Sequence, residues 1–248
     1  MELGLRDKVC VVTGSTGGIG LATAQQLRDE AATVVTSGRS ADGIGDLHVA
    51  ADLSRPGEPE RLIAATLERF GRIDVLVNNV GWAEIHRFDE LDEELWERSW
   101  QINVMSAVRA LRAALPAMKE NGGGAIVNVS STAAKRPSAS MPEYSVTKAA
   151  MLSLSRLVAD LYANDGIRCN AVTPGPTATE AWLGDGGLAE QQGARDEILA
   201  KVGAGRPLGR LAEPDEIAAV IAFLCSERAS YVTGAAWSAD GGTVAIII

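Results

Sequence analysis

A tyrosine and a lysine lie four positions apart in the segment PEYSVTKAAM, residues 142–151. On a helix, residues four positions apart lie on one face, so the side chains of Tyr144 and Lys148 would be neighbours. An ordinary tyrosine has a pKa near ~10, and a nearby cation lowers that pKa because it stabilises the phenolate. The spacing therefore predicts an acid and base pair suited to proton transfer near neutral pH.

This pair needs a helix, from about Glu143 to Ala163, and the rest of the chain must supply a sheet for that helix to pack on. Short apolar runs predict strands at 8–13, 33–38, 47–52, 73–79, 124–131, 167–172 and within 235–242. Helical patterns lie between them at 18–30, 58–70, 92–120 and 214–226. Apolar strands that alternate with helices are typical of a parallel sheet covered on both faces. We therefore predict a single α/β domain over residues 1–248, a doubly wound parallel sheet (Rossmann fold).

The loop between the first predicted strand and helix is rich in glycine. It reads VVTGSTGGIG, residues 11–20, with Gly14, Gly18 and Gly20 in a T-G-x-x-x-G-x-G pattern. Gly14 permits a tight turn, and the later glycines let a pyrophosphate approach the backbone at the positive end of a helix. Because the loop joins a strand to a helix, it predicts a dinucleotide site.

Composition excludes several other classes of function. The net charge of -9 argues against general binding to nucleic acid or to anionic membranes. No apolar run approaches membrane-spanning length, and the first residues do not resemble a signal peptide. The three cysteines are far apart in apolar runs, and the two histidines, His48 and His86, have no partner at ligand spacing. We therefore expect a reduced cytoplasmic protein with no metal site, in which both histidines are structural or exposed.

Further short motifs occur in a fixed order along the chain. They are NNVG (78–81), QIN (101–103), VNVSS (127–131), YSVTK (144–148), NAVTPGPTAT (170–179) and SADGG (238–242). With these motifs and the glycine-rich loop, the chain resembles the classical short-chain dehydrogenase/reductase family over essentially its full length. The resemblance implies an NAD(P)-dependent oxidoreductase that moves a hydride between nicotinamide and a carbonyl or secondary alcohol.

The resemblance also implies the catalytic roles. Tyr144 would exchange a proton with the substrate oxygen, and Lys148 would lower the tyrosine pKa and bind the nicotinamide ribose. Ser131 would bind the same substrate oxygen, while Ser130 should point to the other face of its strand. Asn103 would hold a water that links Lys148 to solvent.

Other residues would hold the cofactor. The resemblance places Asn79 and Gly81 beside the adenine ribose, Asp52 at the adenine amine, Thr177 at the carboxamide and Thr179 near the pyrophosphate. The full predicted cofactor-binding set comprises Gly14, Thr16, Gly18, Ile19, Gly20, Arg39, Asp52, Leu53, Asn79, Gly81, Tyr144, Lys148, Pro174, Thr177 and Thr179.

The end of the second strand departs from the pattern of NAD users. An acid there usually binds both ribose hydroxyls, whereas this chain has Gly38 followed by Arg39. An arginine attracts a 2′-phosphate, so we expect NADP(H) to be preferred over NAD(H). Two observations leave NAD open: Gly17 stands where NADP users often have a basic residue, and Arg39 could stack on adenine.

Two further departures concern the backbone. The stretch between Arg39 and Asp52 leaves little room for the usual helix and is expected to be a loop. Ala31 stands where the family commonly ends its first helix with glycine. If Ala31 must adopt a left-handed conformation, it carries strain.

The substrate should be set by residues 82–90, 132–142 and 179–206. These segments contain Trp82, Met141, Trp182 and Leu183, and the basic residues Arg195, Lys201 and Arg206 look scattered. An apolar ketone or alcohol, cyclic or aromatic compounds included, fits better than a polyanion. We expect an NADPH-dependent ketone reductase whose lid spans about 178–205, with glycine-rich hinge candidates at 184–187 and 203–205.

Three alternatives remain at this point. A 3-oxoacyl-[acyl-carrier-protein] reductase shares the scaffold. A non-catalytic dinucleotide-sensing regulator would usually lack the tyrosine or the lysine, and this chain keeps both. A sugar-nucleotide epimerase or dehydratase is usually longer than this chain.

The surface pattern predicts an oligomer. Trp96 and Trp100 lie one turn apart on the long predicted helix, and the chain ends in the apolar stretch VAIII. Apolar surface of this kind needs cover. We expect a homotetramer, or at least a homodimer, in which the long helices pair across a two-fold axis.

Overall fold

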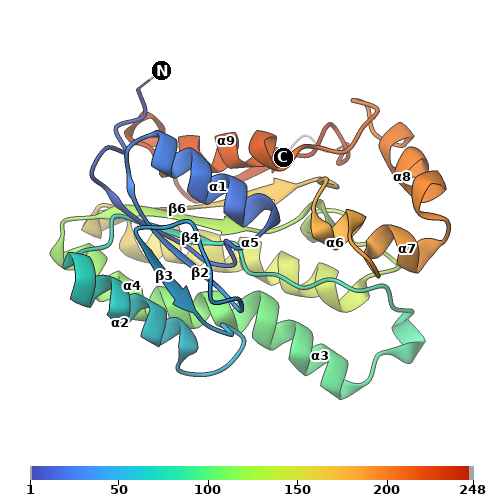
Figure 1. The fold of residues 1–248 in the computed structure, drawn as a ribbon, viewed down its shortest axis with the longest axis horizontal. Coiled ribbons are helices and arrows are strands. Elements are labelled where there is room, and N and C mark those ends of the chain that lie inside the picture. Colours follow the sequence, from blue (N-terminus) through green and yellow to red (C-terminus); the bar gives the residue numbers. More distant parts are fainter. Residues whose placement is uncertain (1, 246–248) are drawn as a thin grey trace.

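A computed structural model describes residues 2–245 and contains a seven-stranded parallel sheet (Figure 1). The strand order is β3-β2-β1-β4-β5-β6-β7, so the chain winds outward from β1 in one direction and then from β4 in the other. The strands are β1 (Val9–Val12), β2 (Thr33–Gly38), β3 (Leu47–Ala50), β4 (Val75–Asn78), β5 (Gly124–Val129), β6 (Ile167–Pro174) and β7 (Ala236–Ala239). This arrangement confirms the predicted doubly wound α/β fold.

Helices cover both faces of the sheet. On one face lie α1 (Gly18–Asp29) and α9 (Pro214–Cys225), and on the other lie α2 (Glu58–Phe70), α4 (Ser106–Glu120) and α5 (Pro142–Tyr162), as Figure 1 shows. The side chains of β1 alternate between the layers, because successive strand residues point to opposite faces. Val9 and Val11 join one core, and Cys10 and Val12 join the other. Burial on both faces explains why the strands are almost continuously apolar.

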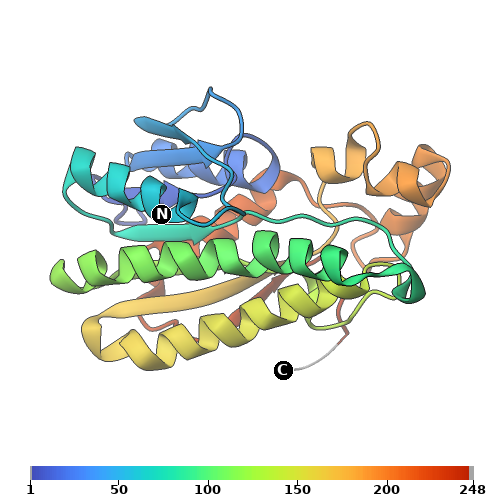
Figure 2. The ribbon, with the colours of Figure 1, turned by 90° about the horizontal axis from the view of Figure 1, so that it is seen from below.

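The long helix predicted over 92–120 is continuous but not uniform. It begins as α3 (Glu93–Trp100), capped by the Asp92 side chain, passes through a π-helical turn η2 (Gln101–Met105), and continues as α4. The Ser106 hydroxyl donates to the Ile102 carbonyl at 2.6 Å within this turn. In Figure 2 the α3–α4 helix runs alongside α5 on the lower face of the molecule. The π turn places Asn103 on the side that faces α5, where its amide reaches the Thr147 hydroxyl at 3.1 Å.

Two backbone expectations are confirmed. Residues 39–46 form a loop between β2 and β3 in place of a helix. Ala31, just after α1, has φ of 61°, the left-handed conformation that glycine adopts more easily. The turn is held by Ala31 N–H to the Arg28 carbonyl at 2.8 Å and Ala32 N–H to the Leu27 carbonyl at 3.1 Å. Ala31 therefore carries the strain that its sequence position predicted.

Three short helices follow β6 at the end of the molecule toward which the strands point (Figures 1 and 2). They are α6 (Glu180–Leu183), α7 (Leu188–Gln192) and α8 (Arg195–Ala204). Short turns η1 (Phe88–Glu90), η3 (Thr132–Ala134), η4 (Ala163–Asp165) and η5 (Glu227–Ala229) complete the structure. Across residues 2–245, each helix is too short or too polar to traverse a lipid bilayer. The apolar end VAIII includes Ile246–Ile248, which lie outside the described residues.

Candidate active site

A cavity of about 980 Å³ lies at the carboxyl ends of the strands. Parallel strands bring their carboxyl ends to one edge, and ligands bind where the strand order reverses, here between β1 and β4. Most of the predicted site residues line this cavity: Gly14, Thr16, Gly18, Ile19, Arg39, Asp52, Leu53, Asn79, Gly81, Ser131, Tyr144, Lys148, Pro174, Thr177 and Thr179. Gly20 and Asn103 do not line it. The fold thus gathers residues from the full length of the chain into one site.

The glycine-rich loop has the form of a phosphate cradle. Gly14 and Gly18 have positive φ of 61° and 52°, and α1 begins at Gly18 with its N–H groups directed out of the helix. Gly17 has open space where a side chain would stand. A side chain at Gly20, by contrast, would overlap the carbonyl oxygen of Gly14. The first glycines leave room for a dinucleotide phosphate, and Gly20 allows the loop to pack on the helix.

Asn79 and Asp52 form hydrogen bonds with neighbouring loops at the cofactor end of the cavity. The Asn79 amide donates to the carbonyl oxygens of Thr13 at 3.1 Å and Gly14 at 3.0 Å, so it fixes the shape of the glycine-rich loop. The Asp52 carboxylate accepts from the Ser54 hydroxyl at 2.7 Å, and this hydrogen bond lowers the pKa of Asp52. Arg39 is close enough for its charge to contribute to that lowering. Hydrogen bonds within the protein therefore fix much of the predicted cofactor end.

Lys148 is buried beneath Tyr144. Its ammonium is 5.7 Å from the centre of the Tyr144 ring and donates to the Val129 carbonyl at 3.0 Å. Only 3% of Lys148 is exposed, and burial lowers its pKa to about 8. Gly81 lies against the ammonium, since a side chain there would approach Lys148 Nζ to 3.1 Å. The missing side chain at Gly81 leaves Lys148 Nζ accessible from the cavity.

The expected lowering of the Tyr144 pKa by Lys148 is wrong for this structure. Burial raises the pKa of Tyr144, and the Ser131 hydroxyl offsets only part of that rise. The physical reason is desolvation, the largest influence on this pKa, which disfavours the phenolate, and Lys148 is not among the groups that shift it. Tyr144 is therefore a protonated acid at neutral pH, ready to donate.

The two serines at the end of β5 have different partners. Ser131 caps η3, where its hydroxyl oxygen accepts from the Ala133 N–H at 3.1 Å. The Ser130 hydroxyl donates to the Lys148 carbonyl at 2.7 Å and so ties β5 to α5. Ser131 is thus next to Tyr144 in the cavity, while Ser130 anchors the catalytic helix.

Asn103 connects three segments around the site. Its side-chain oxygen accepts from the Trp82 N–H at 2.7 Å, and its amide nitrogen lies 3.0 Å from the Trp82 carbonyl and 3.1 Å from the hydroxyls of Ser99 and Thr147. The second lone pair of the oxygen is the place for the predicted water. That water remains a prediction, whereas the positioning of Trp82 follows from the hydrogen bonds.

The substrate end contains groups that the sequence interpretation missed. Trp82, Met141 and Trp182 line the cavity as expected, and Leu183 does not. Arg98, Arg136 and Arg206 also line it, with the Arg98 guanidinium 4.3 Å above the Trp82 ring. The three arginines come from distant loops and helices, and no spacing in the sequence connects them. The expectation of scattered basic residues holds for Arg195 and Lys201 and is wrong for Arg206.

A second missed feature is the pair of His86 and Glu143. The Glu143 carboxylate is fully buried beside Tyr144, and one of its oxygens is 3.0 Å from His86 Nδ1. Its other oxygen has no hydrogen-bond partner among residues 2–245. The His86 N–H also donates to the Ser140 carbonyl at 3.0 Å. His86 is therefore structural, as expected, and it joins the loop after β4 to the start of α5.

Comparison with known proteins agrees with this site. A family model described as Enoyl-(Acyl carrier protein) reductase matches residues 14–244. L-rhamnose 1-dehydrogenase (NAD(P)(+)) of Azotobacter vinelandii is 39% identical over 96% of this chain and 97% of that protein. Cis-4-hydroxycyclohexanecarboxylate dehydrogenase of Sinomonas cyclohexanicum is 38% identical, over 97% and 98%.

A solved structure shows the same likeness in three dimensions. L-sorbose reductase from Gluconobacter frateurii, complexed with NADPH and L-sorbose, superposes with a TM-score of 0.94. It is 35% identical in sequence, and the match covers 100% of both chains. With the Tyr144 and Lys148 site at the end of a doubly wound sheet, these matches show that the chain belongs to the short-chain dehydrogenase/reductase family, as an NAD(P)-dependent oxidoreductase acting on alcohol and carbonyl groups.

Proposed function

We propose that the protein is an NADPH-dependent ketone reductase. The observation that carries this proposal is one continuous cavity with Arg39 at its cofactor end and Ser131, Tyr144 and Lys148 toward its substrate end. The glycine cradle fits a dinucleotide, because its positive-φ residues and the open space at Gly17 leave backbone N–H groups accessible.

The preference for NADPH rests on the end of β2. Arg39 is exposed there and lines the cavity, so its guanidinium can pair with a 2′-phosphate. A side chain at Gly38 would overlap the side chain of Thr16, so an acidic residue could enter that position only if Thr16 moved. The NADPH complex of the similar sorbose reductase supports the same preference.

NADP(H), when bound, supplies or accepts the hydride. Tyr144, protonated because of its burial, donates its proton to the substrate oxygen as negative charge develops there. Ser131 orients that oxygen, and its hydroxyl also stabilises the phenolate that remains on Tyr144. Lys148 has a pKa of about 8, so at neutral pH it carries a positive charge 5.7 Å from the centre of the Tyr144 ring, where it favours the phenolate left after the proton is donated.

The substrate is proposed to be a ketone with an apolar surface. Trp82, Met141, Trp182, Leu188 and Val202 line the substrate end, and their faces suit a ring or a short alkyl chain. The relatives leave two classes open, since rhamnose and sorbose are neutral sugars and hydroxycyclohexanecarboxylate is a hydroxy acid. The family model's description keeps an acyl-carrier thioester as the alternative.

We further propose that residues 178–205 act as a lid. They contain α6, α7 and α8, joined at glycines. The Gln191 side chain accepts from the Ile85 N–H at 2.9 Å and so joins α7 to the loop that follows β4. A lid of this kind would exclude water during the reaction.

We also propose a homotetramer or homodimer that buries the outer face of α5. Val146, Leu157 and Leu161 on α5 are 50%, 54% and 61% exposed, and Trp100 on α3 is 38% exposed. Large apolar side chains exposed along one helix need cover, which a second copy of the chain would supply. Light scattering at micromolar concentration should give a dimer or larger, and a monomer would reject the proposal.

The function is tested by steady-state kinetics with NADPH and NADH against ketones, sugars and a 3-oxoacyl thioester. We expect turnover of ketones and a higher kcat/KM for NADPH. Equal kcat/KM for the two cofactors would refute the cofactor preference. Turnover of the thioester alone would replace ketone reduction by the acyl-carrier alternative.

A further inference from the structure

Two guanidinium groups from distant parts of the chain line the substrate end of the cavity. Arg136 follows η3, five residues after Ser131, and its N–H donates to the Thr132 carbonyl at 2.9 Å. Arg206 follows α8, where its N–H donates to the Gly203 carbonyl at 3.0 Å. The fold brings them to one wall from segments about seventy residues apart.

Arg206 has hydrogen-bonding capacity that the protein does not use. Its side chain is half-buried, one terminal nitrogen donates to the Val202 carbonyl, and Nε is buried without a partner among residues 2–245. Burial and the charge of Arg136 both lower the pKa of Arg206, which nevertheless stays charged at neutral pH. Buried donors of charged groups are costly when unpaired. The terminal nitrogen Nη2 of Arg206 has no hydrogen-bond partner within residues 2–245, and it is the group with which an anion in the cavity would pair.

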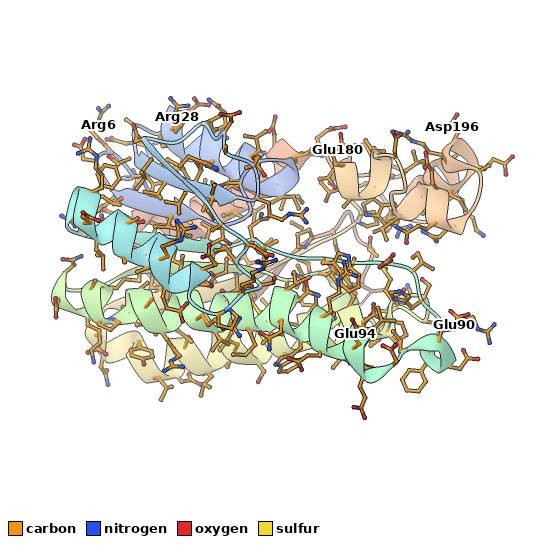
Figure 3. The ribbon with its side chains drawn as sticks, turned by 60° about the horizontal axis from the view of Figure 1, so that its bottom comes forward. Arg6, Arg28, Glu90, Glu94, Glu180 and Asp196 are labelled. Carbon is orange, nitrogen blue, oxygen red and sulfur yellow. The ribbon has the colours of Figure 1, made fainter. Side chains whose placement is uncertain are left out.

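Arg136 and Arg206 lie in the cavity of a protein that is acidic overall. The chain as a whole carries a net charge of -9, and Glu90, Glu94 and Asp196 point outward at the same end of the molecule in Figure 3. Within residues 2–245 no carboxylate forms an ion pair with Arg136 or Arg206. The two arginines therefore differ from Arg210, whose guanidinium pairs with Glu216 at 2.6 Å on the surface.

We propose that Arg136 and Arg206 bind a carboxylate of the substrate, so that the enzyme acts on oxo acids and the corresponding hydroxy acids. This inference rests on the proposed ketone reduction and names its substrate class. A guanidinium matches the two oxygens of a carboxylate with parallel N–H donors. The carbonyl group would lie at Tyr144 and Ser131, and the apolar part of the substrate would contact Trp82 and Met141.

We assign the anion to the substrate, and not to the cofactor, because Arg136 and Arg206 lie at the opposite end of the cavity from Arg39. Arg39 lies at the end of β2 and acts on the charge of Asp52. Arg136 follows the strand-end serine that faces Tyr144, and Arg206 lies beyond α8. The two ends of the cavity thus carry separate cationic groups.

Matched pairs of acid and methyl ester test the proposal. We would compare 4-oxocyclohexanecarboxylate and 3-oxobutanoate with their methyl esters, using NADPH. Wild type should have a kcat/KM at least about tenfold higher for each acid. Arg206→Gln and Arg136→Gln should each lower kcat/KM for the acids by roughly 10- to 100-fold, mainly through KM, and leave the esters little changed.

Lys201→Gln is the matched control. Lys201 is exposed on α8 and does not line the cavity, so its loss removes one positive charge near Arg206 in the sequence without touching the site. It should not change the preference for the acid. A binding measurement supports the kinetics: in the presence of NADP⁺, the acid should raise the thermal midpoint of wild type and of Lys201→Gln, but not of Arg206→Gln.

The outcomes separate the inference from the proposed function. Turnover of esters with no preference for acids, or an equal loss on both in Arg206→Gln, would overturn carboxylate binding and leave ketone reduction intact. Absence of turnover on every ketone would reject the proposed function itself. If Arg206→Gln unfolds, Arg136→Gln decides the matter, because Arg136 is exposed on a loop.

Discussion

The two ends of the cavity are built in different ways. At the cofactor end, strand termini and backbone groups form the wall, and side chains such as Asn79 are hydrogen-bonded to the glycine-rich loop. At the substrate end, loops and short helices form the wall, and the buried Nε of Arg206 has no hydrogen-bond partner within residues 2–245. Under the proposed function, the first end would bind the cofactor that the family shares, and the arginines of the second end would select the substrate.

The largest expected effect lies where the two ends meet. Tyr144→Phe keeps the ring and removes the proton donor, so kcat should fall by about 10²–10⁴. The fold and the Kd for NADPH should not change, since the hydroxyl is not needed for packing. Circular dichroism and fluorescence titration provide the controls. Retention of more than about a tenth of the wild-type kcat would show that Tyr144 is not the acid.

The next largest expected effect is on the free energy of unfolding, because burying the charged Lys148 destabilises the folded protein. Its pKa is about 8 in the folded protein and near ~10.4 when unfolded, so the unfolded chain binds more protons between these values. This contribution therefore raises stability as pH rises from about 8 to about 10.4. Lys148→Met should abolish turnover and stabilise the protein at pH 7 by up to about 3 kcal/mol.

Urea denaturation at pH 7 and near pH 9.5 checks this prediction. The gain from Lys148→Met should shrink at the higher pH, because wild-type Lys148 is then neutral. A variant less stable than wild type at pH 7 would show that the bond to the Val129 carbonyl outweighs the cost of burial.

Arg39→Ala tests whether the two ends act independently. It should weaken NADPH binding by about 1.5–3 kcal/mol, the value of a hydrogen bond to a charged group, and barely change NADH binding. The KM for the ketone should stay constant, because Arg39 is at the cofactor end. Isothermal titration with both cofactors measures the effect. An equal loss for NADPH and NADH would mean that Arg39 stacks on adenine. A changed KM for the ketone would show that the two ends of the cavity do not act independently.

The smallest expected effect is on stability, at Ala31, which does not line the cavity. Ala31→Gly removes the strain of a left-handed alanine and should stabilise the protein by about 1 kcal/mol. Activity should not change. Denaturation midpoints at constant slope provide the measurement, and a destabilised variant would show that the alanine methyl group contributes packing energy that exceeds its strain.

The sequence predicts the cofactor end well for a physical reason. Its residues follow strands or begin helices, and the hydrophobic periodicity and the placement of glycines reveal those positions, as for Gly14 and Arg39. Arg136 and Arg206 escape such reasoning because only the folded loops bring them together. The sequence also predicts the wrong direction for the Tyr144 pKa, because four-residue spacing indicates a neighbour but says nothing about burial.

The π turn at Gln101–Met105 has a consequence for the architecture of the long helix. An α-helix advances about 100° per residue, so one extra residue in a turn rotates everything beyond it relative to everything before it. The helix can thus direct Ala107, Ala110 and Leu111 of α4 into the core, while α3 keeps a different phase, with Trp100 partly exposed. Deleting one residue from this turn would restore a uniform helix and swing Asn103 away from Thr147 and Trp82. The π turn therefore changes which face of the long helix points inward. The same helix can pack against the sheet through α4 and position Asn103 beside the active site.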